Sequence, residues 1–326
     1  MKKSTAVILL LVSLLLIAGG IVLGVATGWS RPGYGTLVTL GEYDTGSLNA
    51  IQINSQSASV CLYDGSGRTV TVDAEGGAGG LFSAELRGNT LVITQEKSGN
   101  TGFRLFGINF ILFGRDAEDL RLVVWLPQSY AGSVAVSTDS GDISLNGLRG
   151  RQSLSLATSS GDVDAYECRA EELNVATSSG DVYLGDSEIS RLLVTASSGQ
   201  ISLRDLICAS LMAETSSGDV WGSVLDADSI GVRTSSGDVI LDDVERGAVE
   251  LNTASGSVAL TDAAPESLSV RTGSGDVDLV LLGDEKAYTV DFSSGSGELD
   301  GSRGGKGDRL VTIRTSSGDA DVSFED

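Results

Sequence analysis

The chain has 326 residues, of which 22 are Lys or Arg and 44 are Asp or Glu, giving a formal net charge of −22. A chain this acidic repels phosphate backbones, so nucleic acid is excluded as a partner class. It contains no His, which removes the commonest general base and transition-metal ligand. Glycine is frequent, with 43 residues, and aromatic residues make up 5%, which is typical of a fold with many tight turns.

The first thirty residues have the pattern of a membrane anchor. Lys2 and Lys3 precede 21 residues without a charge, from Ala6 to Ala26. At about 1.5 Å per residue, a helix of this length spans a bilayer core. The two lysines place the N-terminus in the cytoplasm and the bulk of the chain outside it. A cleaved signal peptide is the alternative, but the apolar run is longer than usual and no A-x-A site follows. The sequence therefore predicts a single-pass cell-membrane protein with one transmembrane helix within 1–30, followed by a linker over 31–46.

Residues 47–130 are predicted to form a β-rich lead-in or capping region. The runs "RTVTVDAE", "NTLVITQEK" and "LRLVVWLP" are separated by Gly, Asn and Asp, as expected for short strands. Between the last two lie four of the seven Phe residues, namely Phe103, Phe106, Phe110 and Phe113. They form either a patch that contacts a partner or membrane, or a plug over the open apolar end of the repeat array. The plug is favoured because repeat proteins need covered ends.

Residues 131–326 contain a repeat built on the step T-S-S-G-D-V. Its glycines are Gly141, Gly161, Gly180, Gly199, Gly218, Gly237, Gly256, Gly275, Gly297 and Gly318. The intervals between them are 20, then 19 six times, then 22 and 21. Apolar residues recur seven and five positions before the Gly, two positions after it and, in most repeats, four positions after it. This pattern indicates two strands per repeat with one buried face.

Two topologies fit this pattern. The turns close either antiparallel hairpins or the coils of a parallel solenoid, in which equivalent residues stack about 4.8 Å apart. A solenoid explains the constant length of 19 residues, because its columns stack only if each coil has the same length. The fold class is therefore predicted as all-β, a parallel β-solenoid with about 19 residues per coil, preceded by the transmembrane helix.

Three sets of residues are candidates for chemistry. An Asp column follows the glycines, at Asp142, Asp162, Asp181, Asp219, Asp238, Asp276 and Asp319. A Thr column lies three residues before them, at Thr138, Thr158, Thr177, Thr215, Thr234, Thr253 and Thr272. A Ser column lies directly before them, at Ser160, Ser179, Ser198, Ser217, Ser236, Ser255 and Ser274. The three cysteines, Cys61, Cys168 and Cys208, lack metal-ligand spacing and are predicted to be small buried residues.

These columns are predicted to be structural. Calcium-binding β-rolls need Gly and Asp every nine residues, whereas here Asp recurs every 19, and Gln200 and Ser257 interrupt its column. A serine nucleophile needs an adjacent base, which a chain without His does not provide in the usual way. Instead, the hydroxyls and carboxylates are expected to bond along the rod and to turn amides. The sequence thus predicts no catalytic, cofactor-binding or metal-binding residues.

A lead-in ending in "LRLVVWLP" and followed by repeated "TSSGDV" steps resembles the bacterial DUF4097 family, over residues 47–326. The resemblance implies a β-solenoid-like cell-envelope protein of the adhesin type, without established enzymatic activity and without functional residues to carry over.

Together these observations favour a non-enzymatic scaffold or adhesin at the bacterial cell envelope, which binds cell-wall or surface glycans or other surface proteins. A polysaccharide lyase or hydrolase on a β-helix is one alternative. Such an enzyme requires a local group of carboxylates with a basic residue on one strand face, which breaks the column pattern. An envelope-stress regulator is the second alternative, and it would need a partner inside the cell.

Overall fold

The computed structural model describes residues 37–75, 81–96, 102–105, 108–111, 120–150 and 153–325. Of its two compact units, the second, Leu37–Asp326, holds all of these residues. The expected transmembrane helix within 1–30 lies outside the described residues. From residue 37 onward, the described part of the chain contains no helix long and apolar enough to cross a membrane.

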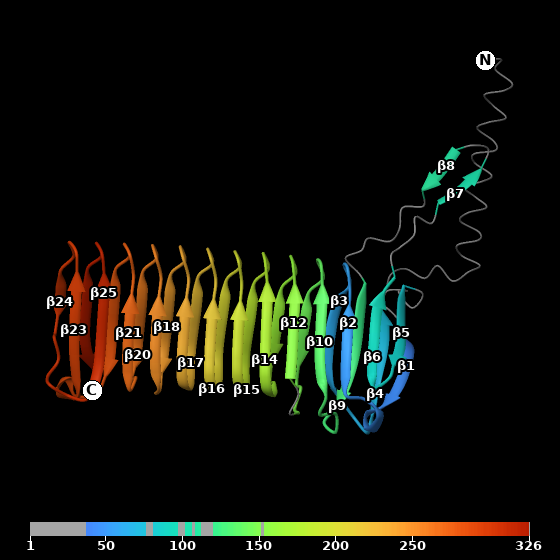
Figure 1. Ribbon diagram of the computed structural model, residues 1–326, viewed down its shortest axis with the longest axis horizontal. Coiled ribbons are helices and arrows are strands. Elements are labelled where there is room, and N and C mark those ends of the chain that lie inside the picture. The colour runs from blue at the N-terminus through green and yellow to red at the C-terminus, as the bar shows by residue number, and fades with distance from the viewer. Residues whose placement is uncertain are drawn as a thin grey trace, which may run out of the picture. The chain divides into compact units, whose positions relative to one another are not determined.

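The described unit is a parallel β-solenoid, as predicted (Figure 1). Twenty-four strands form one continuous sheet, in which equivalent strands of successive coils pair in parallel and in register. Val182, for example, pairs with Ile201, which pairs with Val220. Their spacing of 19 residues is the spacing that the sequence repeat predicted.

Each regular coil has an entry strand that leads into the T-S-S-G turn and an exit strand that leaves it. We call the outer surfaces of these strands the entry face and the exit face. The coils before the middle are formed by β10 (Ser133–Thr138), β11 (Ile143–Asn146), β12 (Ser153–Thr158), β13 (Val163–Tyr166) and β14 (Arg169–Thr177). In the middle, β15 (Val182–Thr195), β16 (Ile201–Glu214) and β17 (Val220–Arg233) each combine an exit strand with the next entry strand. The later coils are formed by β18 (Val239–Val244), β19 (Ala248–Asn252), β20 (Val258–Ala263), β21 (Ser267–Arg271) and β22 (Val277–Leu282).

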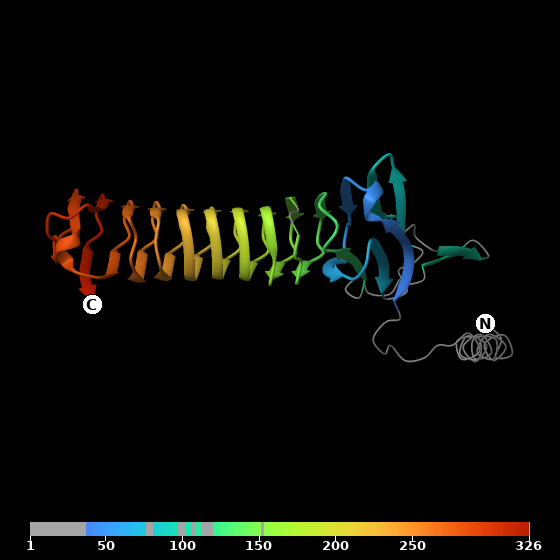
Figure 2. The same ribbon diagram turned by 90° about the horizontal axis from the view of Figure 1, so that it is seen from below.

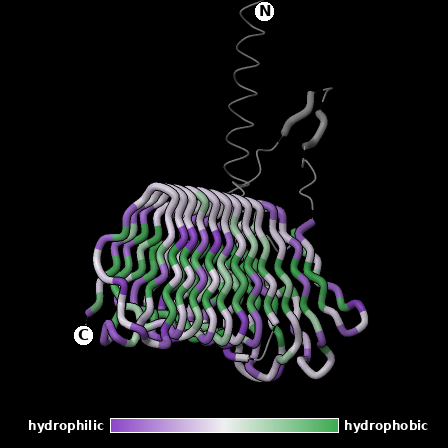
Figure 3. Tube along the Cα trace, turned by 60° about the vertical axis from the view of Figure 1, so that its left-hand side comes forward, coloured by the Kyte–Doolittle hydropathy of each residue, from purple (hydrophilic) through white to green (hydrophobic). Residues whose placement is uncertain are grey.

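The core runs along the inside of the rod in straight rows (Figure 3). One row has no solvent exposure at any of its seven positions, Val163, Val182, Ile201, Val220, Val239, Val258 and Val277. Fully burying one such side chain stabilises the fold by about 1.5–3 kcal/mol. Since that burial depends on the coils on either side, no coil is stable without its neighbours.

At the C-terminal end, the order of the coils differs from the order of the chain. The last two strands, β25 (Arg309–Thr315) and β26 (Ala320–Glu325), pair with β21 and β22 of the coil that ends near residue 282. The preceding strands, β23 (Tyr288–Ser294) and β24 (Leu299–Gly301), pair with the far side of β25 and β26 (Figure 1). The final segment is therefore inserted between two coils. The terminal coil is β23–β24, after the short 3₁₀ helix η4 (Glu285–Ala287), although β25 and β26 come later in the chain.

The outer strand edge of the terminal coil is covered by a later segment of the chain. Residues 302–307 fold back along β23, where the amide of Val290 donates to the carbonyl oxygen of Arg303 at 3.1 Å. The Thr289 hydroxyl donates to the carbonyl oxygen of Gly307 at 2.9 Å. Covered edges prevent strand addition by another chain.

The N-terminal end is closed by a change from parallel to antiparallel pairing (Figure 2). A first coil, β2 (Ala50–Asn54) and β3 (Ser59–Gly65), pairs with β10 and β11. Outside it lie β6 (Thr90–Gln95) and β9 (Arg121–Pro127), which still pair in parallel with the first coil. Antiparallel pairing then begins, since β5 (Phe82–Arg87) pairs with β6 and β4 (Thr69–Glu75) pairs with β9. The outermost strand, β1 (Val38–Asp44), pairs antiparallel with β4 and precedes the 3₁₀ helix η1 (Thr45–Ser47). The range expected as a linker, 31–46, thus contributes β1 to the sheet.

The aromatic segment expected as a plug contains a separate hairpin of β7 (Gly102–Leu105) and β8 (Ile108–Ile111), in which Phe103 pairs with Phe110. The side chains of all four Phe residues lie outside the described part, and the plug remains a prediction.

Candidate functional site

The Thr column closes the turns, as the sequence predicted. In the coil of Gly237, the Thr234 hydroxyl accepts from the Gly237 amide at 3.1 Å and donates to the Gly218 carbonyl oxygen at 3.2 Å. The same pair of bonds occurs at Thr158, Thr253 and Thr272. These hydroxyls are buried and committed as both donor and acceptor, which leaves them unsuited to nucleophilic attack.

The Asp column forms a ladder of hydrogen bonds along the outside of the turns. The Oδ1 atom of Asp162 accepts from the backbone amide of Asp181 at 2.8 Å, and Oδ1 of Asp181 accepts from that of Gln200 at 2.8 Å. Asp142, Asp219, Asp238, Asp276 and Asp319 accept in the same way. Each carboxylate thus supports the next coil. Among the described side chains, no three or more Cys, Asp or Glu residues are arranged to hold a metal ion.

The three cysteines are buried and unpaired by disulfides, as predicted. Burial raises the pKa of the Cys168 thiol to about 11 and that of Cys208 to about 12. The thiolate is the reactive form of cysteine, so these residues are poor nucleophiles.

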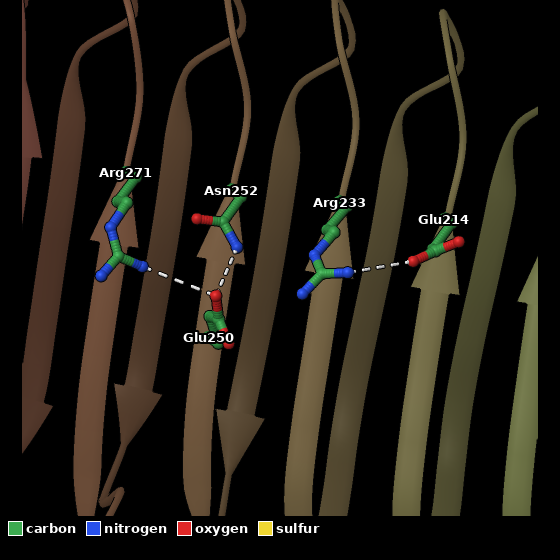
Figure 4. A network of polar contacts seen from close by, with 5 residues as sticks. All are labelled: Glu214, Arg233, Glu250, Asn252 and Arg271. Carbon is green, nitrogen blue, oxygen red and sulfur yellow. Dashed lines mark hydrogen bonds and ion pairs between the residues drawn. The ribbon is translucent and has the colours of Figure 1, made fainter.

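A set of charged and polar residues on the entry face departs from the column pattern. We call Glu214, Arg233, Glu250, Asn252 and Arg271 the polar strip (Figure 4). Arg233 contacts Glu214 at 3.4 Å, and Arg271 contacts Glu250 at 3.5 Å. The Asn252 amide donates to the same Glu250 carboxylate at 2.9 Å. The two ion pairs each join neighbouring coils, so that the strip follows the axis of the solenoid.

Sequence reasoning missed the polar strip, although a signal was present. The position four residues before the turn glycine is Ser137, Ala157, Ala176 and Thr195 in the earlier coils. It then becomes Glu214, Arg233, Asn252 and Arg271. This change from small side chains to larger, mostly charged ones in one outward-facing column marks the strip.

A shallow groove of about 500 Å³ runs beside the strip, across four coils. Its lining residues are Thr195, Ala196, Glu214, Thr215, Ser216, Arg233, Thr234, Ser235, Asn252, Thr253 and Ala254. The groove is polar and follows the rod, which suits an elongated ligand with many hydroxyl or amide groups better than a compact apolar one.

The polar strip has the residue types that the alternative function, a polysaccharide lyase or hydrolase, requires, because carboxylates and basic residues share one face. Its carboxylates, however, are each held by an arginine. Glu214 and Glu250 belong to coils that are two steps apart, or about 10 Å at the usual strand spacing. Paired carboxylates in glycosidases lie about 5–9.5 Å apart. The geometry therefore favours hydrogen bonding to a ligand over acid–base catalysis.

Comparison with known proteins agrees with this architecture. The Toastrack DUF4097 family model matches residues 48–222 and 182–326. The chain belongs to the DUF4097 family. No curated protein matches it.

Three solved structures illustrate its similarity to other bacterial proteins. A candidate cell adhesion protein from Clostridium sporogenes is 10% identical, with 89% of this chain and 100% of that chain covered and a TM-score of 0.29. A candidate adhesin from Bacteroides fragilis is 13% identical, with coverages of 88% and 97% and a TM-score of 0.35. A candidate lipid-binding protein from Parabacteroides distasonis is 13% identical, with coverages of 89% and 97% and a TM-score of 0.37.

Proposed function

We propose that this DUF4097 protein is a non-enzymatic adhesion or scaffold module of the bacterial cell envelope. Its solenoid binds wall or surface glycans, or other surface proteins, through repeated side chains on flat faces. The observation that carries the proposal is the polar strip, where Arg233, Asn252 and Arg271 line up along the rod axis beside a shallow groove. Such an array offers many weak contacts to a long ligand in place of one deep pocket.

The proposed location is the outer side of the cell membrane. The uncharged run from Ala6 to Ala26 would hold the protein there as a single span, with Lys2 and Lys3 on the cytoplasmic side. The net charge of −22 fits this placement, because it keeps the solenoid soluble and away from anionic lipid headgroups.

The enzymatic alternative has one observation in its favour, the carboxylates and arginines of the polar strip. We favour binding because Glu214 and Glu250 are engaged by Arg233 and Arg271. The coils of these two glutamates are also two steps apart, or about 10 Å at the usual strand spacing, whereas paired carboxylates in glycosidases lie about 5–9.5 Å apart.

The proposal is tested by co-sedimentation of the detergent-solubilised full chain with insoluble cell-wall material and with a panel of immobilised glycans, each with and without calcium. We expect saturable binding that does not depend on calcium. The double variant Arg233→Ala/Arg271→Ala should bind less than the unchanged chain. A matched control is Arg169→Ala/Arg191→Ala, which removes two exposed arginines elsewhere on the rod. Equal loss in both variants would mean that the strip has no special role, and absence of binding to every material would refute the proposed function.

A further inference from the structure

The aromatic residues of the regular coils are confined to one face. Between Ser133 and Leu282 the sequence has three aromatic residues, Tyr166, Tyr183 and Trp221. All three point outward from exit strands, and none belongs to the core. Tyr166 is 39% exposed and Trp221 is 46% exposed. We call these three residues the aromatic strip. A core built of Val, Leu and Ile does not need them, so their place on the surface calls for another explanation.

The ring of Tyr166 contacts the neighbouring coil at Gly185. Tyr166 pairs with Gly185 across the strands, and a Cβ atom on Gly185 would lie 2.9 Å from both Cδ1 and Cε1 of the Tyr166 ring. The missing side chain of Gly185 thus leaves room for one edge of the ring. Since Tyr166 is 39% exposed, part of the ring stays accessible to a stacking partner.

The aromatic strip runs parallel to the rod axis. Tyr183 is diagonal to Tyr166 on the next coil, since Tyr183 pairs with Asp164, two residues before Tyr166. Trp221 follows in the same column as Tyr183, with Ser202 between them. Two coils therefore separate Tyr183 from Trp221, or about 10 Å at the usual spacing between strands.

Carboxylates border the aromatic strip in three of its four coils, the exception being the coil of Gln200. Asp162, Asp181 and Asp219 of the Asp column lie on the same outward side of the exit strands, and Asp164 lies beside Tyr183. Burial and the negative charges of Asp162 and Asp142 raise the pKa of Asp164. Arg204 lies in the same column as Tyr166, on the far side of Gly185, and its charge is matched by Asp205 at 2.9 Å. The surface is therefore aromatic and strongly negative at once.

We infer that the exit face, from the coil of Gly161 to that of Gly218, binds an extended chain of β-linked amino sugars with free ammonium groups. The sugar rings stack on the aromatic strip, and the ammonium groups face the Asp column and the aromatic rings. Ammonium groups are attracted both to carboxylates and to the faces of Trp and Tyr. The inference rests on the proposed function, and it names a second face and the class of glycan.

The repeat distance favours a sugar chain over a cationic peptide. Each β-linked pyranose advances an extended chain by close to one coil of the solenoid, so that every second ring meets Tyr183 and then Trp221 in the same way. In an extended peptide, side chains on one face recur about every 6.8 Å, which does not match coils about 4.8 Å apart. The acidic surface also repels uronic acids, phosphodiester polymers and other anionic glycans.

The test uses the full chain in detergent at pH 6, with a β-1,4-linked glucosamine hexamer as the probe and calorimetry as the readout. The fully N-acetylated hexamer serves as the uncharged control. We expect the glucosamine hexamer to bind at least about tenfold more tightly than the N-acetylated hexamer, and we expect added salt to weaken the binding of the glucosamine hexamer. Trp221→Ala should weaken binding of the glucosamine hexamer about tenfold, whereas Trp221→Phe should retain most of the affinity.

Two matched substitutions separate the site from general effects. Asp181→Asn keeps an oxygen for the Gln200 amide but removes the charge, and should weaken binding about threefold or more. Asp276→Asn makes the same change away from the strip, where Asp276 accepts from Asp319, and should leave binding unchanged. Ile207→Ala removes another exposed apolar side chain, 52% exposed, and should also have no effect.

Several results would overturn the inference. Equal affinity for the two hexamers would rule out recognition of the ammonium groups. Equal binding of oligolysine, with the same sensitivity to Trp221→Ala, would assign the face to a cationic peptide. If neither hexamer binds while the full chain still sediments with cell-wall material, this inference fails and the proposed function stands. Loss of both kinds of binding would refute both.

Discussion

The carbonyl oxygen of Gly161 occupies the space that a Cβ atom on Gly180 would need, 1.8 Å from its ideal position. Gly199, Gly237, Gly256 and Gly275 stand in the same relationship to the turn glycine of the preceding coil. The repeat therefore requires glycine because successive turns stack backbone on backbone.

Replacing Gly180 by Ala should destabilise the protein by at least about 3 kcal/mol, because the obstacle is main chain that cannot rotate away. Thermal unfolding followed by circular dichroism measures the effect. Gly231→Ala is the matched control, since there the nearest atom is the flexible Met212 side chain at 2.7 Å. Similar melting temperatures for the two variants would show that the stacked turns tolerate a Cβ atom.

The Thr column has a natural gap at Ala196, three residues before Gly199. Ala196→Thr should add the hydroxyl found in other coils and raise stability by about 1 kcal/mol. Thr234→Val should lower it by about 2 kcal/mol, because the Gly237 amide and the Gly218 carbonyl lose a buried partner. Thr234→Ser keeps the hydroxyl, so its stability should be closer to that of the unchanged protein. Denaturant titration distinguishes these cases, and a neutral Thr234→Val would contradict the role assigned to the column.

Val224 has a left-handed backbone, with φ of 54°. The equivalent residues in the coils on either side, Asp205 and Asp243, have φ of 48° and 55°. Asp and Asn tolerate this region, whereas a β-branched side chain is strained there. Val224→Asn should therefore stabilise the protein by about 1 kcal/mol, and Asp205→Val should destabilise it by a similar amount. A shift of the melting temperature in the opposite direction for either variant would argue against strain at this corner.

Asp164 makes stability depend on pH. Burial, followed by the charges of Asp162 and Asp142, raises its pKa, so the folded chain holds this proton more tightly than the unfolded chain. The resulting stabilisation is complete below the unfolded pKa, near 3.8, and is lost as pH rises through the higher folded pKa. Asp164→Asn should thus raise the melting temperature at pH 7 and change it little at pH 3. Asp278→Asn should behave alike, because burial and then Asp321 and Asp276 raise that pKa. An equal effect at both pH values would show that ionisation is not the cause.

The sequence predicted the features that repeat. The 19-residue spacing, the inward row through Val182 and Ile201, the Thr hydroxyls at the turns and the Asp side chains as acceptors all follow from a column in which every coil has the same environment. Such a column is visible in one sequence because each coil repeats the same physical requirement.

Features that depend on one place in the rod were not predictable in this way. The intervals of 22 and 21 residues before Gly297 and Gly318 suggested two further coils in chain order. In the structure, Gly318 stacks on Gly275, and Gly297 stacks on Gly318. Both arrangements satisfy the same local pattern, and only the pairing of β25 with β21 decides between them.

The left-handed corner six residues after each turn glycine was missed for another reason. Its members are Gly147, Glu167, Asp186, Asp205, Val224, Asp243 and Asp262. Only one of these seven residues is Gly, which is too weak a signal to predict a positive φ at this position. Four Asp residues, which tolerate that conformation, were the available signal.

The most direct test of a binding role, as opposed to a catalytic one, follows bound protein and released sugar in the same sample. The full chain is incubated with insoluble glucosamine-containing cell-wall polysaccharide, and both sedimented protein and soluble reducing ends are measured over time. We predict that the protein sediments with the polysaccharide and that reducing ends stay at the level of a protein-free control. A steady release of sugar fragments that is abolished by Glu214→Gln or Glu250→Gln would contradict this account and establish the polar strip as an active site.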